Sequence, residues 1–147
     1  MKTVSSTVEI NASPERVWAI LTDLPRHASW DPFITAISGS LMPGQKLNVT
    51  IHPPGSRPTS FKPTVTSVVE NRELAWLGRL VMPGLFDGAH RFTLERTQSG
   101  TKVLASESFS GLLVGLSPGL LRHTQQGFEE LNAALKRRAE EGTAIDH

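Results

Sequence analysis

One long helical pattern near the end of the chain constrains the possible folds more than any other feature. It starts at Ser117-Pro118, because serine can cap a helix and proline suits the first helical position. Gly142 is a plausible end, and residues 143–147 are expected to fray. The residues on the predicted buried face recur at helical spacings of three and four: Leu121, Thr124, Phe128, Leu131 and Leu135.

Most of the chain before this helix consists of short extended runs. Gly, Pro, Asn or Ser separate these runs, which is typical of an antiparallel meander. A short helix interrupts them after the first run, beginning at Ser13-Pro14-Glu15 and ending before Pro25, and a brief turn is expected over residues 27–31. The predicted strands are 4–10, 34–40, 46–52, 61–69, 72–78, 89–96 and 101–110.

A sheet of this size needs a cover for its apolar face, and the final helix is the only predicted element long enough to supply it. We therefore predict an α+β fold in which a curved antiparallel sheet surrounds the long C-terminal helix, within one domain over residues 1–142. If the sheet curves around the helix without closing completely, a pocket lined by large apolar residues remains between them.

Composition narrows the possible partners and location. The 147 residues have 38% hydrophobic content and a formal charge of +1, and the arginines are scattered, so neither nucleic acid nor an anionic membrane is favoured. There is no cysteine, no signal-peptide pattern, and no apolar run near the roughly 20 residues that span a bilayer. We expect a cytoplasmic protein without stable membrane insertion, either a monomer or a homodimer.

Several stretches resemble a known family. The opening "VEINASPERVWAILTDLPRHASWDPF" is similar to START-like proteins of the polyketide cyclase/dehydrase and lipid-transport type, the SRPBCC group. The likeness rests on the Ser-Pro-Glu turn, Val17-Trp18, Asp23, Trp30 and Pro32-Phe33, and continues through "FKPTVTSVVENRELAWLGRLVMPGLFDGAHRFTLE" and "GTKVLASESFSGLL". It covers residues 4–140 and implies a helix-grip fold of about seven strands around an apolar cavity. It does not select an activity, because the superfamily contains lipid carriers, cyclases, ligand sensors and chaperone-activating domains.

The last predicted hairpin carries the pair of side chains best suited to ligand binding or acid–base chemistry. A two-residue turn at Ser99-Gly100 would place Phe92 opposite Glu107 and His90 opposite Phe109. All four would then share one face, with His90 and Glu107 as diagonal neighbours on an otherwise apolar surface. Such a pair could orient the polar end of a ligand or act as general acid and base.

Other residues are predicted to complete the site. Trp30 and Phe33 flank a proline-containing turn and are assigned to the entrance, and Phe86 in "MPGLFDG" is assigned to a lid. Asp31 and Asp87 are interpreted as turn formers. The expected apolar walls, together with one hydroxyl from the helix, are Trp76, Phe92, Phe109, Leu121, Thr124 and Phe128.

The sequence shows no metal or cofactor motif. The histidines other than His90 lack metal-ligand spacing, and neither a phosphate-binding loop nor a nucleophile elbow is present. Our preferred hypothesis is therefore a carrier or sensor of a small hydrophobic or amphipathic molecule, without a cofactor. The alternatives are a cyclase or dehydratase using His90 and Glu107, and a protein-interaction module of the chaperone-activator type.

Overall fold

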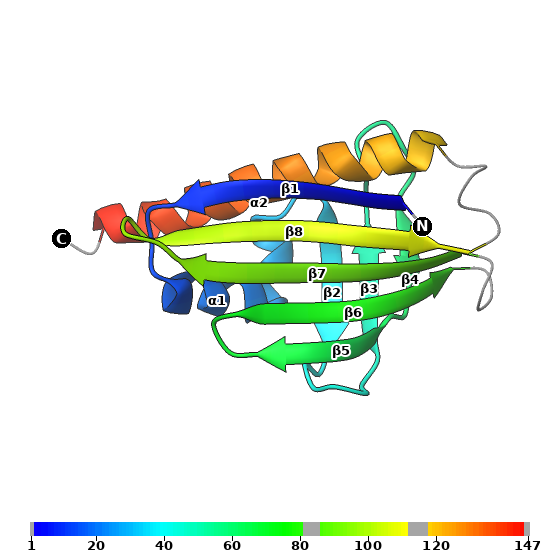
Figure 1. Ribbon diagram of the computed structural model, residues 1–147, viewed down its shortest axis with the longest axis horizontal. Helices are drawn as coiled ribbons and strands as arrows, with labels where there is room; N and C mark the ends of the chain where they lie inside the picture. Colours follow the sequence, from blue (N-terminus) through cyan, green and yellow to red (C-terminus); the bar gives the residue numbers. More distant parts are fainter. Residues whose placement is uncertain (1, 81–85, 112–117, 146–147) are drawn as a thin grey trace.

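A computed structural model describes residues 2–80, 86–111 and 118–145 of the 147-residue chain. Its elements follow the order strand, two short helices, seven further strands and one long helix (Figure 1). The helical elements are α1 (Pro14–Thr22), the 3-10 helix η1 (Leu24–Ser29) and α2 (Pro118–Ile145). The strands are β1 (Lys2–Ile10), β2 (Ile34–Gly39), β3 (Leu47–Ile51), β4 (Thr59–Phe61), β5 (Thr64–Val69), β6 (Glu73–Leu80), β7 (Phe86–Arg96) and β8 (Thr101–Ser110).

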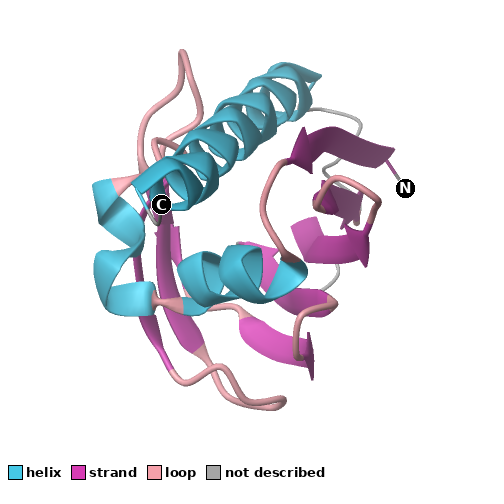
Figure 2. Cartoon of the chain, turned by 90° about the vertical axis from the view of Figure 1, so that its left-hand side faces the viewer, coloured by secondary structure: helices cyan, strands magenta, loops and turns pink. Residues whose placement is uncertain are grey.

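The described strands form two antiparallel sheets that face each other. One has five strands in the order β1-β8-β7-β6-β5, and the other has three in the order β2-β3-β4. Figure 2 shows the sheets on opposite sides, with α2 crossing above the space between them. The predicted α+β helix-grip class is confirmed, and the curved surface that surrounds α2 is divided between the two sheets.

Most predicted boundaries differ from the structure by one to three residues, and two further predictions were wrong. The run 61–69 is not one strand, because the chain leaves β4 at Phe61 and β5 begins at Thr64, in the other sheet. Pro63 lies between them and has no backbone N–H with which to continue a ladder. The helix also does not stop at Gly142 but runs to Ile145, since one glycine lowers helix propensity without terminating a long helix. Residues 146–147 lie outside the described part.

The buried face of α2 is the one that its sequence pattern predicts. Phe128, Leu131 and Leu135 have no exposed surface and join a single core cluster with residues from α1 and both sheets. Thr124 is also buried, with 2% exposure. Because every layer contributes to this cluster, its burial stabilises the position of the helix over the sheets.

A close approach of α2 to the three-stranded sheet occurs at Gly127. A Cβ atom at this position would collide with the ring of Phe33, the residue that leads into β2. Phe33 is itself 2% exposed and packs edge-on against Phe128, with 5.3 Å between the ring centroids. The missing side chain at Gly127 therefore lets the helix sit against an aromatic ring.

Side chains of α2 also cover the free edge of β1, beside which the helix runs (Figure 1). The Gln125 side chain accepts a hydrogen bond from the Ser5 backbone N–H at 3.0 Å and donates one to the Ser5 carbonyl at 2.6 Å. Asn132 donates to the Ser6 carbonyl at 2.9 Å. An open strand edge is a template for unwanted pairing, and these contacts occupy part of it.

The far end of β1 is held by a charged pair on α2. Lys136 donates to the Glu9 carbonyl at 2.9 Å and to Glu140 at 2.6 Å, while Glu140 accepts from the Asn11 backbone N–H at 2.9 Å. These hydrogen bonds, the one from Lys136 first, lower the pKa of Glu140 below its ordinary value. The stabilisation is therefore present when Glu140 is ionised and is lost as the pH falls through its folded-state pKa.

Replacing Gln125 with alanine should reduce the free energy of unfolding by about 1 kcal/mol, because Ser5 loses both side-chain partners at a partly solvated edge. Gln126 is exposed on the same helix, and its alanine variant should change stability by less than about 0.5 kcal/mol. Urea unfolding of the two variants measures the difference. Equal effects at both positions would contradict the role of Gln125 at the strand edge.

Gly127→Ala should destabilise the protein, although alanine alone would favour a helix by about 1 kcal/mol. The added methyl group must displace the Phe33 ring within a packed core, so we expect a net loss of about 1–3 kcal/mol. Gly119→Ala is the matched control on the same helix, since its Cβ would meet no atom of the described residues within 4 Å. Thermal and urea unfolding should show no loss for the control; a gain in stability at both positions would refute the close contact.

Candidate functional site

His90 and Glu107 lie directly opposite each other in the β7–β8 ladder. The predicted register was wrong by two residues, because the turn spans Thr97–Gly100 and Arg96 pairs with Thr101. Thr97 closes this turn by accepting a bond from the Gly100 N–H on its hydroxyl, at 3.1 Å. A shift of two residues leaves every side chain on the same face, so the predicted face is confirmed.

This face points inward and His90 lies deep in it. The His90 ring stacks on Trp76 with 4.5 Å between centroids and meets Phe92 and Phe128 edge-on at 4.4 and 5.3 Å. Its side chain is 4% exposed, and its Nδ1 atom is 3.5 Å from Oε1 of Glu107. Its Nε2 atom is buried without a hydrogen-bond partner among the described residues. Glu107 is more accessible, at 19% exposure.

A partly enclosed, mostly apolar cavity lies beside Glu107, where the two sheets meet the first turns of α2. Its volume is about 30 Å³, close to what one water molecule requires. The five-stranded sheet, the three-stranded sheet and the helix all contribute to its wall. The described lining residues are Ile51, Phe61, Gly78, Gly88, Glu107, Phe109, Leu120 and Thr124.

Two paired glycines explain why the space exists. Gly78 on β6 and Gly88 on β7 are direct partners in the ladder, in line with the inward residues Trp76 and His90. The Phe61 ring lies over Gly78, where a Cβ atom would be 3.2 Å from it, and Oε2 of Glu107 occupies the place of a Cβ at Gly88. The two glycines therefore leave a shallow depression on the inner face of the sheet. The Phe61 ring and the Glu107 carboxylate both lie over it.

Nine of the eleven predicted site residues divide into three groups. Glu107, Phe109 and Thr124 line the cavity. Leu121 packs against Phe109 beside it. A third group lies in the surrounding core and does not line the cavity: Phe33, Trp76, His90, Phe92 and Phe128.

The residues predicted for the entrance lie away from the cavity, and the side chain predicted for the lid lies outside the described part. Phe33 lies under Gly127 in the core, and Trp30 packs on His27 with 4.5 Å between ring centroids, so neither forms an opening to this cavity. The backbone of Phe86 begins β7, but its side chain and residues 81–85 lie outside the described part, which leaves the lid as a prediction. Asp87 is not a turn former, because it lies within β7 and pairs with Arg79 and Ser110.

Sequence reasoning missed five lining residues: Ile51, Phe61, Gly78, Gly88 and Leu120. Gly78 and Gly88 carried a usable signal, since a glycine within a strand often marks a position where another group approaches closely. Two such glycines on the same face of neighbouring strands indicate a hollow. Ile51, Phe61 and Leu120 had no such signal, because the packing of three separate elements brings them together.

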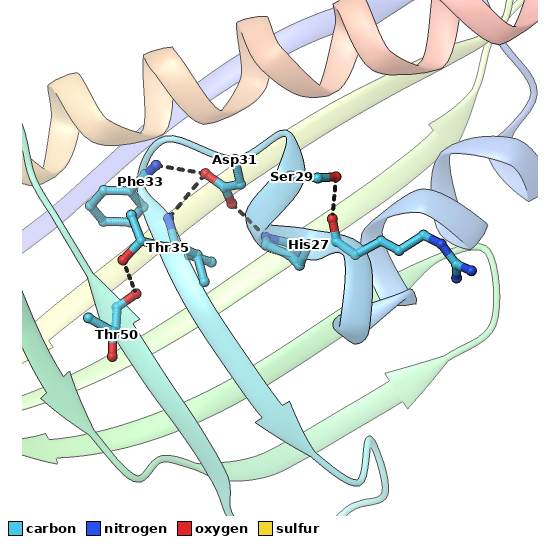
Figure 3. Close-up of polar contacts among 8 residues, drawn as sticks. His27, Ser29, Asp31, Phe33, Thr35 and Thr50 are labelled. Carbon is cyan, nitrogen blue, oxygen red and sulfur yellow. Dashed lines mark hydrogen bonds and ion pairs between the residues drawn. The ribbon is translucent and has the colours of Figure 1, made fainter.

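A second histidine–carboxylate pair, in which both side chains are buried, serves the fold. The Asp31 carboxylate receives a contact from His27 Nε2 at 2.6 Å and hydrogen bonds from the backbone N–H groups of Phe33 and Ile34 at 2.8 and 3.1 Å (Figure 3). The interpretation of Asp31 as a turn former is confirmed. By joining η1 to the start of β2, Asp31 holds Phe33 where α2 packs on it.

The other hollows of the described surface have a different character. One of them, of about 830 Å³, is an open groove at the opposite end of the sheet, between the start of α1 and the β5–β6 turn. Charged residues form much of it, and Arg96 and Glu15 make an ion pair there at 2.7 Å.

Within the described ranges, no group of three or more His, Asp or Glu side chains could hold a metal ion. No helix of the described chain has the length and apolarity needed to cross a membrane.

Comparisons with known proteins agree with this architecture. A START superfamily protein from Mycobacterium smegmatis is 22% identical, with a TM-score of 0.73 over 95% of this chain and 97% of that one. A protein from Thermus thermophilus is 18% identical, with a TM-score of 0.74 over 96% of this chain and 99% of that one. A Mesorhizobium loti protein is 24% identical, with a TM-score of 0.67 over 92% and 98%.

At these identities the likeness to solved structures shows the fold alone. No curated protein matches the chain. The family model described as "Polyketide cyclase / dehydrase and lipid transport" matches residues 1–140, nearly the whole sequence. The chain therefore belongs to the polyketide cyclase/dehydrase and lipid transport family.

Proposed function

We propose that this protein binds a small hydrophobic or amphipathic molecule in the cavity between the two sheets and α2. The observation that carries the proposal is the pair Gly78 and Gly88, which removes two side chains from the inner face under the helix. The described part of the lining is apolar except for Glu107 and Thr124. Binding sites for small molecules typically have this composition, with few polar groups in an apolar wall.

The cavity must enlarge to take a ligand, since about 30 Å³ holds little more than water. Three lining residues can provide the space, because Ile51, Phe61 and Leu120 are only partly buried, unlike the closed core around Phe92 and Phe128. Movement of the Phe61 ring away from Gly78 would open the floor at low packing cost. We infer that a ligand enters on the side formed by β3, β4 and the first turn of α2.

A proton-transfer enzyme is the second candidate, and Glu107 is the residue that favours it. Its carboxylate lines the cavity and can reach a bound molecule, which general acid or base catalysis requires. His90 does not line the cavity and contacts Glu107 from the core side. In an enzyme, His90 would therefore position Glu107 and would not touch the substrate.

Filling the cavity should weaken binding without unfolding the protein. Gly78 does not have a positive φ angle, so valine, which favours strands, can replace it and occupy the space under Phe61. Ala89→Val is the matched control, because Ala89 is exposed on the neighbouring strand β7. We expect hexan-1-ol and phenol to bind the Gly78→Val variant at least about tenfold more weakly, a loss of ~1.4 kcal/mol.

Backbone amide chemical shifts in NMR titrations measure this binding and also show whether each variant is folded. The Ala89→Val variant should bind like the unmodified protein. Unchanged affinity in a folded Gly78→Val variant would refute the cavity as the binding site. Native mass spectrometry of protein purified from its own host provides an independent test, since a carrier or sensor should retain a small molecule there.

A further inference from the structure

The cavity carries a single ionisable side chain among its described lining residues. That side chain is Glu107, and the only other polar side chain in the described wall is Thr124. No lysine or arginine contributes to the described wall, so nothing there offers a positive charge to an anionic ligand. Because the described wall offers only a carboxylate, ligands with positively and negatively charged ends should bind it with different affinities.

The two oxygens of Glu107 have different surroundings. Oε1 faces Nδ1 of His90 at 3.5 Å, on the core side. Oε2 lies over Gly88, where a Cβ atom would collide with it. Among the described residues, no hydrogen-bond donor is assigned to Oε2. Oε1 of this carboxylate thus contacts His90 on the core side, and Oε2 is available to a ligand on the cavity side.

We propose that the cavity selects ligands whose polar end is a protonated amine and discriminates against carboxylates of the same size. The inference rests on the proposed function, because it concerns the ligand of the same cavity. An ammonium group would make a charge-assisted hydrogen bond to Oε2 of Glu107, and such bonds are strong in a weakly polar site. A bound carboxylate would instead lie against a second carboxylate, which disfavours having both ionised.

His90 does not reverse this preference. It approaches Oε1 and does not line the cavity, so even as a cation it could not donate directly to a ligand carboxylate there. Its ring is held on three sides by Trp76, Phe92 and Phe128. Rotation toward the cavity would break this packing. The group that a ligand meets is therefore the Glu107 carboxylate, supplemented by the Thr124 hydroxyl.

The test compares three probes with the same alkyl chain: hexylamine, hexan-1-ol and hexanoate. Each is titrated at neutral pH into the unmodified protein, into Glu107→Gln and into Glu95→Gln, with amide shifts at Gly78, Gly88 and Phe109 as the readout. Glu95 is exposed on β7 and provides the matched change of charge outside the cavity. We expect hexylamine to bind at least about tenfold more tightly than hexanoate in the unmodified protein and in Glu95→Gln.

In Glu107→Gln the preference for hexylamine over hexanoate should fall to less than about threefold, because the glutamine amide has no charge but a shape similar to that of the carboxylate. Equal binding of hexylamine and hexanoate, or tighter binding of hexanoate, would overturn the amine preference while the ligand-binding function stands. Absence of binding by all three probes would overturn the proposed function and the amine preference together. Because the comparison in the unmodified protein requires no variant, the proposal can be refuted even if Glu107→Gln does not fold.

Discussion

The seating of α2 on the ring of Phe33 is the contact on which the rest of the structure depends. Gly127 lets the helix backbone approach that ring, and Asp31 holds Phe33 in place through hydrogen bonds to the chain that enters β2. Because of this contact, the middle of α2 packs over the core, where Phe128 is completely buried. The first turns of the helix then extend beyond the core, over the part of the sheet where Gly78 and Gly88 leave a hollow.

The same arrangement gives the two histidine–carboxylate pairs different roles. The Asp31 carboxylate is saturated by His27 and two backbone N–H groups, so it serves as a joint between η1 and β2. The Glu107 carboxylate has one contact from His90 and one side open to the cavity. A polar group in an otherwise apolar wall can orient a bound molecule, provided that one of its atoms is left for the ligand. This contrast is why Glu107, and not Asp31, is central to the proposed function.

Much of the fold could be predicted because periodicity reports local structure directly. The buried stripe of α2, the short helix after β1 and the inward face of β7 and β8 all follow from residue spacing. The face of the hairpin was predicted correctly although its register was not, because a two-residue error preserves side-chain alternation. The turn itself was harder, since Thr97 uses its side chain to stabilise a longer connection than the Ser99-Gly100 dipeptide indicated.

The sequence alone determined most of the secondary structure, the fold class and the shared face of His90, Phe92, Glu107 and Phe109, because these depend largely on spacing along one chain. Only the tertiary structure decided that Glu107 reaches the cavity while His90 lies behind it, and that Phe33 lies in the core. It also decided that Ile51, Phe61 and Leu120 meet over the two glycines. The physical reason is that a cavity is a space left where separate elements pack imperfectly. Its wall therefore depends on the distances between those elements, which no local pattern encodes.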